Sequence, residues 1–163
     1  MDVEESCSIR AKPRAVWALV SDVTRMGRWS PETTSCRWLD GATGPAPGAR
    51  FRGSNQHGPL RWVTTCTVTA AEPGRRFAFD VGFGGVAISE WSYDLRATPD
   101  GCVVTESWSD RRPRWMRLSS VPVTGIVDRA GHNRRGMRAT LAALKAAAEG
   151  DGSTDGEGAT AAS

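Results

Sequence analysis

The sequence predicts an α+β domain in which one antiparallel sheet of seven strands is covered by a long C-terminal helix. Its 163 residues fit a single domain with one core. Residues 34–110 alternate between apolar and polar side chains at a period of two, and turn-forming residues divide them into strand-length pieces. Beyond about residue 124 the apolar period returns to 3.6, which is typical of an amphipathic helix.

Three short elements are predicted before the alternating region. Residues 3–10 alternate as a strand does, and a proline then suits the first turn of a helix over residues 13–22. Residues 24–29 predict a second short helix with Thr24 as its N-cap. We expect this helix to end before the Ser-Pro pair that follows, because the residue before a proline is disfavoured in helical geometry.

The alternating region divides into six predicted strands. Gly-Pro, Pro-Gly and Gly-Gly pairs mark turns between them. Together with the first strand they predict a seven-stranded sheet, whose strands span residues 3–10, 34–40, 48–57, 60–71, 75–82, 86–97 and 102–110.

A long helix is predicted to complete the domain. It begins near residue 119 or 124 and ends at Gly150, and its buried stripe consists of Ile126, Ala130, Asn133, Met137, Leu141 and Leu144. A helix of about 25 residues is long enough to lie across a sheet. Residues 150–163 contain no large apolar side chain, so we expect a flexible acidic tail after a folded domain of residues 1–149.

Composition excludes several classes of protein. No apolar run approaches the roughly 20 residues of a membrane-spanning helix, and the acidic N-terminus lacks the features of a secretory signal, so a cytoplasmic location is expected. The four cysteines are widely spaced, with no Cys-x-x-Cys pair. We therefore expect no metal site and no cofactor, and we interpret the cysteines as small buried apolar side chains.

Aromatic side chains concentrate on the strand faces predicted to point inward. The chain has 7 Trp against 4 Phe and 1 Tyr. In residues 102–110 the face with Glu106 and Trp108 is the richer one, although the face with Val103 and Thr105 is nearly as suitable. The other strands predict an inward set of Phe51, Asn55, His57, Trp62, Thr64, Phe79, Trp91 and Tyr93. This mixture fits either a small-molecule cavity or a solid core whose polar groups are satisfied internally.

Motifs along most of the chain are similar to those of one known superfamily. They include Ala11-Lys12-Pro13-x-Ala15-Val16-Trp17, Trp29-Ser30-Pro31-Glu32, Gly48-Ala49-Arg50-Phe51-x-Gly53-x-Asn55, Trp91-x-Tyr93-x-Leu95 and Met137-x-x-Thr140-Leu141. These residues resemble the START-like superfamily, in its polyketide cyclase/dehydrase branch, over residues 3–149. The resemblance implies a helix-grip (START/Bet v 1-like) fold, in which a curved sheet wraps the C-terminal helix and leaves a deep hydrophobic cavity.

The resemblance leads to a first hypothesis, the binding of a hydrophobic small molecule, aromatic or polycyclic, in that cavity. Members of the superfamily bind lipids, hormones or aromatic metabolites, and some direct the cyclisation of polyketide chains. The expected lining is Trp38, Phe51, Asn55, Trp62, Thr64, Phe79, Trp91, Tyr93, Trp108, Trp115, Met116, Asn133 and Met137.

A second hypothesis is a polyketide aromatase/cyclase that uses the same cavity. Such a reaction needs proton donors and acceptors in a dry pocket. The candidates are Glu106 as base, Tyr93 as acid and His57 as a switchable donor near the mouth. Each has a plainer interpretation, because Glu106 is compatible with the outer face, Tyr93 with an ordinary core position and His57 with a turn.

A basic segment at residues 111–117 supports a third hypothesis, a module that binds nucleic acid or a partner through this segment and the basic stretch of the last helix. Arginines interleaved with an aromatic side chain can hold nucleic acid, although a solvated loop is the plainer interpretation and we expect no nucleic acid partner. The segment also suits a gate, with Trp115 and Met116 as an apolar lip, that attracts an anionic ligand or an acidic carrier protein. We expect His132 in an exposed basic stretch of the last helix. The sequence as a whole is compatible with a monomer or a homodimer.

Overall fold

Seven antiparallel strands form one sheet in the computed structural model, which describes residues 2–112 and 124–151. The strand order is β1-β7-β6-β5-β4-β3-β2, so the first strand pairs with the last one and the other strands follow as a meander. The strands are β1 (Asp2–Ile9), β2 (Thr33–Trp38), β3 (Arg50–His57), β4 (Leu60–Glu72), β5 (Arg76–Phe83), β6 (Val86–Thr98) and β7 (Gly101–Asp110).

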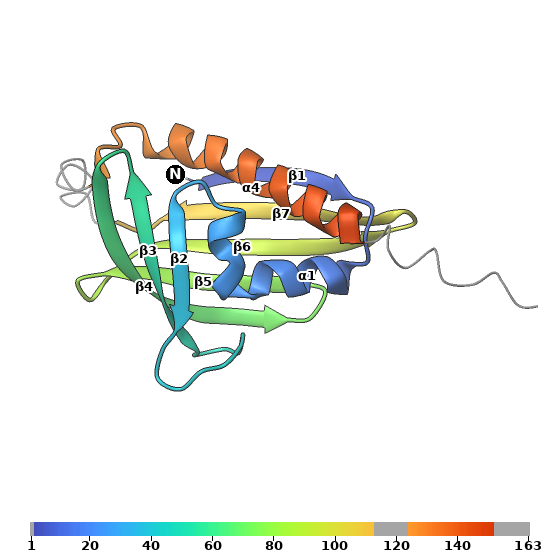
Figure 1. Cartoon of the computed structure of the whole chain (residues 1–163), viewed down its shortest axis with the longest axis horizontal. Helices are drawn as coiled ribbons and strands as arrows, with labels where there is room; N and C mark the ends of the chain where they lie inside the picture. The colour runs from blue at the N-terminus through green and yellow to red at the C-terminus, as the bar shows by residue number, and fades with distance from the viewer. Residues whose placement is uncertain (1, 113–123, 152–163) are drawn as a thin grey trace, which may run out of the picture.

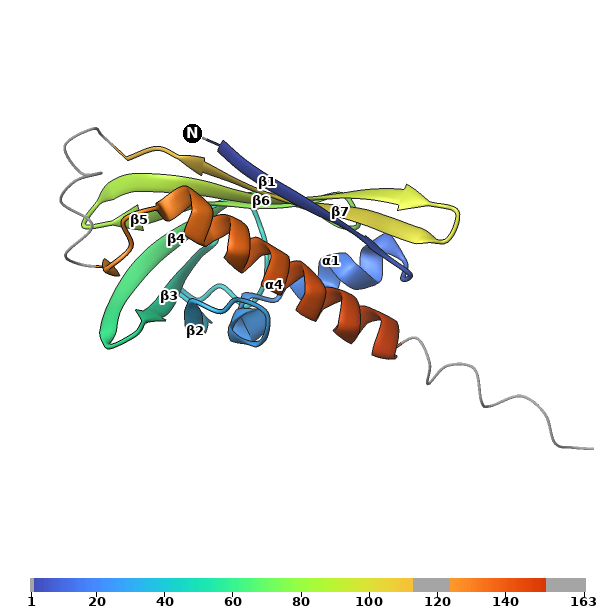
Figure 2. The same ribbon diagram turned by 90° about the horizontal axis from the view of Figure 1, so that it is seen from above.

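The helices lie on one face of this sheet. They are α1 (Pro13–Ser21), the short 3-10 helix η1 (Val23–Arg28) and α4 (Arg129–Asp151). Figures 1 and 2 show α4 running obliquely along the sheet, with α1 beside its C-terminal half. The sheet curves around these helices, which is the helix-grip fold that the sequence predicts. Among the described residues, no helix combines the length and apolar character that crossing a membrane requires.

Two predicted helix starts are wrong, and both errors concern the cap. Asp22, not Thr24, caps η1, because its carboxylate accepts hydrogen bonds from the Thr24 amide at 3.2 Å and the Thr24 hydroxyl at 2.5 Å. The long helix begins at Arg129. Gly125 has a φ of 69° and interrupts helical geometry, and the Asp128 carboxylate then accepts from the Gly131 amide at 2.9 Å as an N-terminal cap.

The main core lies between the inner face of the sheet, α1 and the C-terminal half of α4. Its fully buried side chains include Phe51, Phe77 and Leu144. A smaller cluster of Val3, Trp108 and Met137 lies under the N-terminal half of α4. The β4–β5 register shifts between Val68 and Ala70, as it does at a β-bulge.

The inner face of β7 is the one that contains Glu106. Four side chains on this face are buried, namely Cys102, Val104, Glu106 and Trp108, whereas Val103, Thr105 and Ser107 on the alternative face are half-buried. Tryptophans on β4, β6 and β7 also point inward: Trp62 and Trp108 are buried and Trp91 is half-buried. The aromatic excess in the composition therefore belongs mainly to the inner face of the sheet.

Candidate functional site

A pocket of about 80 Å³ lies between the inner face of the sheet and the N-terminal half of α4. Strands β5, β6 and β7 form its floor, α4 covers it, and η1 with the turn before β2 closes one side. We call it the sheet–helix pocket. Its lining consists of Met26, Ser30, Pro31, Glu32, Phe79, Trp91, Tyr93, Glu106, His132, Asn133, Gly136, Met137 and Thr140.

The apolar wall of the pocket follows from strand register. Phe79 on β5 pairs with Trp91 on β6, and Trp91 pairs with Trp108 on β7, so three aromatic side chains form a row across the sheet. The Trp91 and Trp108 rings lie 6.5 Å apart. Met137 packs on this row from α4. Phe79, Trp91 and Met137 line the pocket, whereas Trp108 continues the aromatic row beyond it.

The polar wall is built from the next row of the same strands. Tyr93 on β6 pairs with Glu106 on β7, and the Tyr93 hydroxyl donates to Glu106 Oε1 at 2.8 Å. Burial raises the pKa of Glu106 to about 8, although the hydrogen bond from Tyr93 acts in the opposite direction. Burial, and then the proximity of Glu106, raises the pKa of Tyr93 well above its ordinary value. At neutral pH both groups are therefore protonated.

Two further polar atoms of the pocket have no hydrogen-bond partner among the described residues. They are Oε2 of Glu106 and Nδ2 of Asn133. The two side chains are 2% and 4% exposed, so solvent at the surface does not satisfy them. Buried polar groups are hydrogen-bonded in the great majority of cases, which makes this pair unusual.

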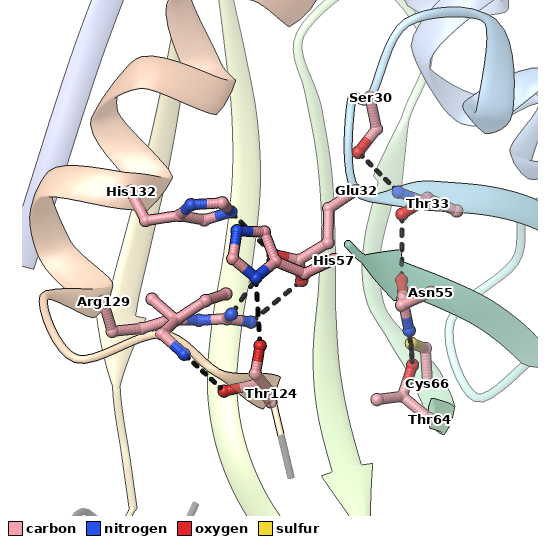
Figure 3. Close-up of polar contacts among 11 residues, drawn as sticks. Ser30, Glu32, Thr33, Asn55, His57, Thr64, Cys66, Thr124, Arg129 and His132 are labelled. Atoms are coloured by element: carbon pink, nitrogen blue, oxygen red, sulfur yellow. Dashed lines mark hydrogen bonds and ion pairs between the residues drawn. The ribbon is translucent and has the colours of Figure 1, made fainter. Parts of the chain in front are cut away.

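Four polar side chains form a cluster at the rim of the pocket, shown in Figure 3. We call Glu32, His57, Arg129 and His132 the rim cluster. The Arg129 guanidinium donates to both Glu32 oxygens, at 2.9 and 3.1 Å, and His132 Nε2 donates to Glu32 Oε2 at 2.9 Å. The rings of His57 and His132 lie 5.1 Å apart, edge to face. The cluster ties the turn before β2 and the end of β3 to the first turns of α4.

The expectation that His132 is exposed is wrong. Its side chain is 23% exposed and faces Glu32 across the rim. The first turn of α4 directs both Arg129 and His132 toward Glu32. Burial lowers the pKa of His132 from its ordinary value, and Arg129 and His57 add to this effect while Glu32 opposes it. His57 is also part of this rim, where its Nδ1 donates to the Thr124 carbonyl at 3.2 Å.

Asn55 and Thr64 satisfy one another instead of facing the pocket. The Thr33 hydroxyl donates to Asn55 Oδ1 at 3.1 Å, and Asn55 Nδ2 donates to Thr64 Oγ1 at 3.3 Å (Figure 3). This series of bonds joins β2, β3 and β4. It matches the alternative in which the polar groups of the inner face are satisfied internally.

The structure divides the predicted lining into three groups. Five of the predicted side chains line the sheet–helix pocket, namely Phe79, Trp91, Tyr93, Asn133 and Met137. Others lie elsewhere on the inner face and do not line it: Trp38, Phe51, Asn55, Trp62, Thr64 and Trp108. Trp115 and Met116, with most of the predicted gate, lie outside the described residues.

Sequence reasoning missed seven lining residues, which lie on helices or in the turn before β2: Met26, Ser30, Pro31, Glu32, His132, Gly136 and Thr140. Glu32 follows the second short helix, and its partner His132 is 100 positions away in the chain. Gly136 and Thr140 share a helical stripe with Asn133 and Met137, so the 3.6-residue period was a usable signal for both. No short-range pattern predicts the contact with Glu32.

The cysteines take no part in this site. All four are free, and none of them lines the pocket. Burial raises the pKa of the Cys36 and Cys66 thiols to about 12, which keeps them in the unreactive thiol form. Within residues 2–112 and 124–151, no group of three His, Cys, Asp or Glu side chains is arranged to hold a metal ion.

A family model decides the relationship of the chain to known proteins. Residues 1–149 match the family described as polyketide cyclase / dehydrase and lipid transport. The chain belongs to this family. No protein with a curated description matches the chain.

Several solved structures are similar to the chain over most of its length. A Polyketide_cyc-like protein from Corynebacterium glutamicum is 33% identical, with 97% of each chain covered and a TM-score of 0.63. An AHSA1-like protein from Aeromonas hydrophila is 21% identical, with a TM-score of 0.62 and coverage of 93% of this chain and 94% of the other. The di-domain ARO/CYC StfQ from the steffimycin biosynthetic pathway is 12% identical, with a TM-score of 0.70. The alignment covers 93% of this chain and 51% of StfQ, and this likeness supports the fold alone.

Proposed function

We propose that this protein binds a small, largely apolar molecule in the sheet–helix pocket. The observation that supports this function is a partly enclosed space with an apolar wall of Phe79, Trp91 and Met137 and a few convergent polar groups. Such a combination is the usual description of a small-molecule site. Membership of a family described by both cyclisation and lipid transport is consistent with it.

The volume of the pocket limits the ligand. About 80 Å³ is below the roughly 150 Å³ of an engineered protein cavity that accepts benzene, and below the roughly 300–1,000 Å³ of drug-sized sites. A ligand with one aromatic ring therefore requires a modest outward movement of the pocket wall. A polycyclic ligand requires a larger one. The rim cluster joins the segments that must separate, so its contacts oppose this opening.

The experiment for this function is a binding assay that includes a variant with a filled pocket. Gly136 lines the pocket from α4, and a Cβ there meets only Pro31 at ordinary contact distance, 3.7 Å. Gly136→Leu should therefore fill the pocket and keep the fold. Ala139→Leu adds the same side chain to an exposed position of the same helix and is the matched control.

The probe is α-methylstyrene, a planar hydrocarbon with one ring. Calorimetric or NMR titration should give saturable binding to the unmodified protein and to Ala139→Leu, and none to Gly136→Leu. Equal binding by all three proteins would place the probe outside the pocket. No binding to any of them would contradict the proposed function for ligands of this size.

A second candidate function, cyclisation of a poly-β-ketone, is favoured by the Tyr93–Glu106 pair. A carboxyl group whose pKa of about 8 lies near the working pH can both release and take up a proton in a reaction. Its buried position next to the Tyr93 hydroxyl suits the removal of a carbon-bound proton and the protonation of a carbonyl oxygen. Glu106→Gln should abolish turnover of a poly-β-ketone mimic, whereas turnover at the unmodified rate would remove Glu106 from the mechanism.

A further inference from the structure

The two unpartnered atoms of the sheet–helix pocket come from opposite walls. Glu106 rises from the floor on β7, and Asn133 comes down from α4. Both side chains are nearly fully buried, and both line the same small space. Neither atom has a partner among the described residues, so both are available to a group bound in this space.

Both atoms act as hydrogen-bond donors. The side-chain amide nitrogen of Asn133 only donates. Glu106 Oε1 already accepts from Tyr93, so Oε2 is the atom that holds the proton when the carboxyl group is neutral. Burial raises the pKa of Glu106 to about 8, which keeps that proton in place at neutral pH.

We propose that the ligand presents a neutral acceptor oxygen, of the carbonyl type, to Glu106 Oε2 and Asn133 Nδ2. This assignment rests on the proposed function and adds the chemical class of the ligand to it. A carbonyl oxygen has two lone pairs and so accepts from both donors at once. The remainder of the ligand then lies against the apolar wall.

A charged ligand group fits these walls less well. Neither donor is charged, and burial of an ion without a partner of opposite charge is costly. Arg129, the cation of the rim cluster, already donates to both oxygens of Glu32. A ketone, aldehyde or ester is therefore favoured over a carboxylate or an ammonium group.

The test compares three probes of nearly equal shape that differ in one group. Acetophenone offers a carbonyl oxygen, α-methylstyrene replaces that oxygen by CH₂, and 1-phenylethylamine replaces it by an ammonium group. Acetophenone should bind about tenfold more tightly than α-methylstyrene, a ratio expected from a buried hydrogen bond. The amine should bind least. Acetophenone labelled with ¹³C at its carbonyl should show a downfield shift when bound, as a carbonyl that accepts hydrogen bonds does.

The possible failures are distinguishable. Equal binding of acetophenone and α-methylstyrene would overturn the carbonyl assignment and leave the proposed function intact. This result is expected if a water molecule, and not the ligand, satisfies the two donors. Tighter binding of the amine would overturn the assignment in favour of a cationic ligand. Absence of binding by all three probes would contradict the proposed function and this inference together.

Substitutions separate hydrogen bonding from an effect on the fold. Asn133→Leu keeps the branched shape of the side chain and removes the donor, so the preference for acetophenone over α-methylstyrene should shrink severalfold. Ser92→Ala is the control, because Ser92 is a buried hydroxyl on β6 that does not line the pocket. Its preference should equal that of the unmodified protein. An unchanged preference in Asn133→Leu would remove Asn133 from the assignment.

The pH dependence of acetophenone affinity gives an independent readout. Above about pH 8 the Glu106 carboxyl group ionises, and Oε2 then repels a carbonyl oxygen. Affinity for acetophenone should therefore fall between pH 7 and 9.5, while affinity for α-methylstyrene stays nearly constant. Glu106→Gln keeps a donor without a titration, so its acetophenone affinity should not depend on pH. Retention of the pH dependence in that variant would overturn the role of Glu106.

Other ionisable groups belong to the pocket wall or to the neighbouring strand and helix. Tyr93 keeps its proton over this range because its pKa is raised well above its ordinary value of 10.0. Glu5 lies opposite Glu106 on β1 and is held by two arginines of α4. The remaining groups line the pocket or are paired with Glu32 or Glu5: Glu32, Arg129, His132, Arg134 and Arg138.

Discussion

The buried carboxyl group of Glu106 should make the stability of the protein fall as pH rises. Its pKa is raised from 4.5 to about 8, with burial as the cause. In the unfolded chain the group ionises near its ordinary pKa, while the native state keeps the proton. The native state therefore binds more protons than the unfolded state between these two values, and its stability declines there. The substitution Glu106→Gln removes this titration and preserves an acceptor for Tyr93.

The size of the effect follows from the two pKa values. One pH unit in this range is worth about 1.4 kcal/mol per proton. Over the complete titration, the free energy of unfolding should fall by about 5 kcal/mol through this group alone. The stabilising contribution of the neutral carboxyl group is fully present below pH 4.5 and fully lost above about pH 8.

Other buried groups decide which part of that range is informative. Burial lowers the pKa of His132 from 6.5, so this group makes stability rise with pH until that ordinary value is reached. The thiols of Cys36 and Cys66 have pKa values raised from 9.0 to about 12, so their effect begins near pH 9. Between pH 6.5 and 8, Glu106 makes the largest contribution to the change in the free energy of unfolding, about 2 kcal/mol.

The assay is urea unfolding followed by circular dichroism at half-unit steps from pH 6.5 to 8. The unmodified protein should lose about 2 kcal/mol over this window, and Glu106→Gln should lose far less. Glu72→Gln, at an exposed position of β4, is the control and should match the unmodified protein. Equal slopes in the unmodified protein and Glu106→Gln would refute the reasoning that the carboxyl group is buried and neutral.

Three further predictions concern the rim, a turn and the core. Glu32→Gln removes a half-buried partner of Arg129 and should cost about 1–2 kcal/mol in urea unfolding, whereas the exposed control Asp40→Asn should cost less than about 0.5. Gly101→Ala should cost more than about 2 kcal/mol, because φ is 150° and a Cβ would collide with the backbone of β1; a neutral effect would contradict this geometry. Phe51→Ala should cost about 3–5 kcal/mol, and a loss below 1 would contradict its place in the core.

Strand alternation explains why so much of the fold was predictable. Trp62, Thr64, Cys66 and Val68 are all buried, as the period of two requires once one face is covered. Where the two faces of a strand are similarly apolar, as in β7, the period of two does not show which face points inward. Packing against α4 determines the inner face of β7. The cap of α4 was missed because it depends on the local geometry of Gly125 and Asp128.

The candidate site was less predictable than the fold. Tyr93 and Glu106 were identified because each lies on a patterned strand, and register then places them side by side. The rim cluster depends on contacts between segments far apart in the chain, which no local pattern encodes. The volume of the pocket depends on how side chains of α4 fill the space above the sheet, so a mixed inner face does not by itself distinguish a large cavity from a small one.

The location of a bound probe is the most direct test of the central claim. Nuclear Overhauser effects from bound α-methylstyrene should reach the Met137 methyl group and the Trp91 ring, because these form the apolar wall of the sheet–helix pocket. Effects confined to the outer face of the sheet, for example to Val103, would contradict the claim that this protein binds its ligand between the sheet and α4.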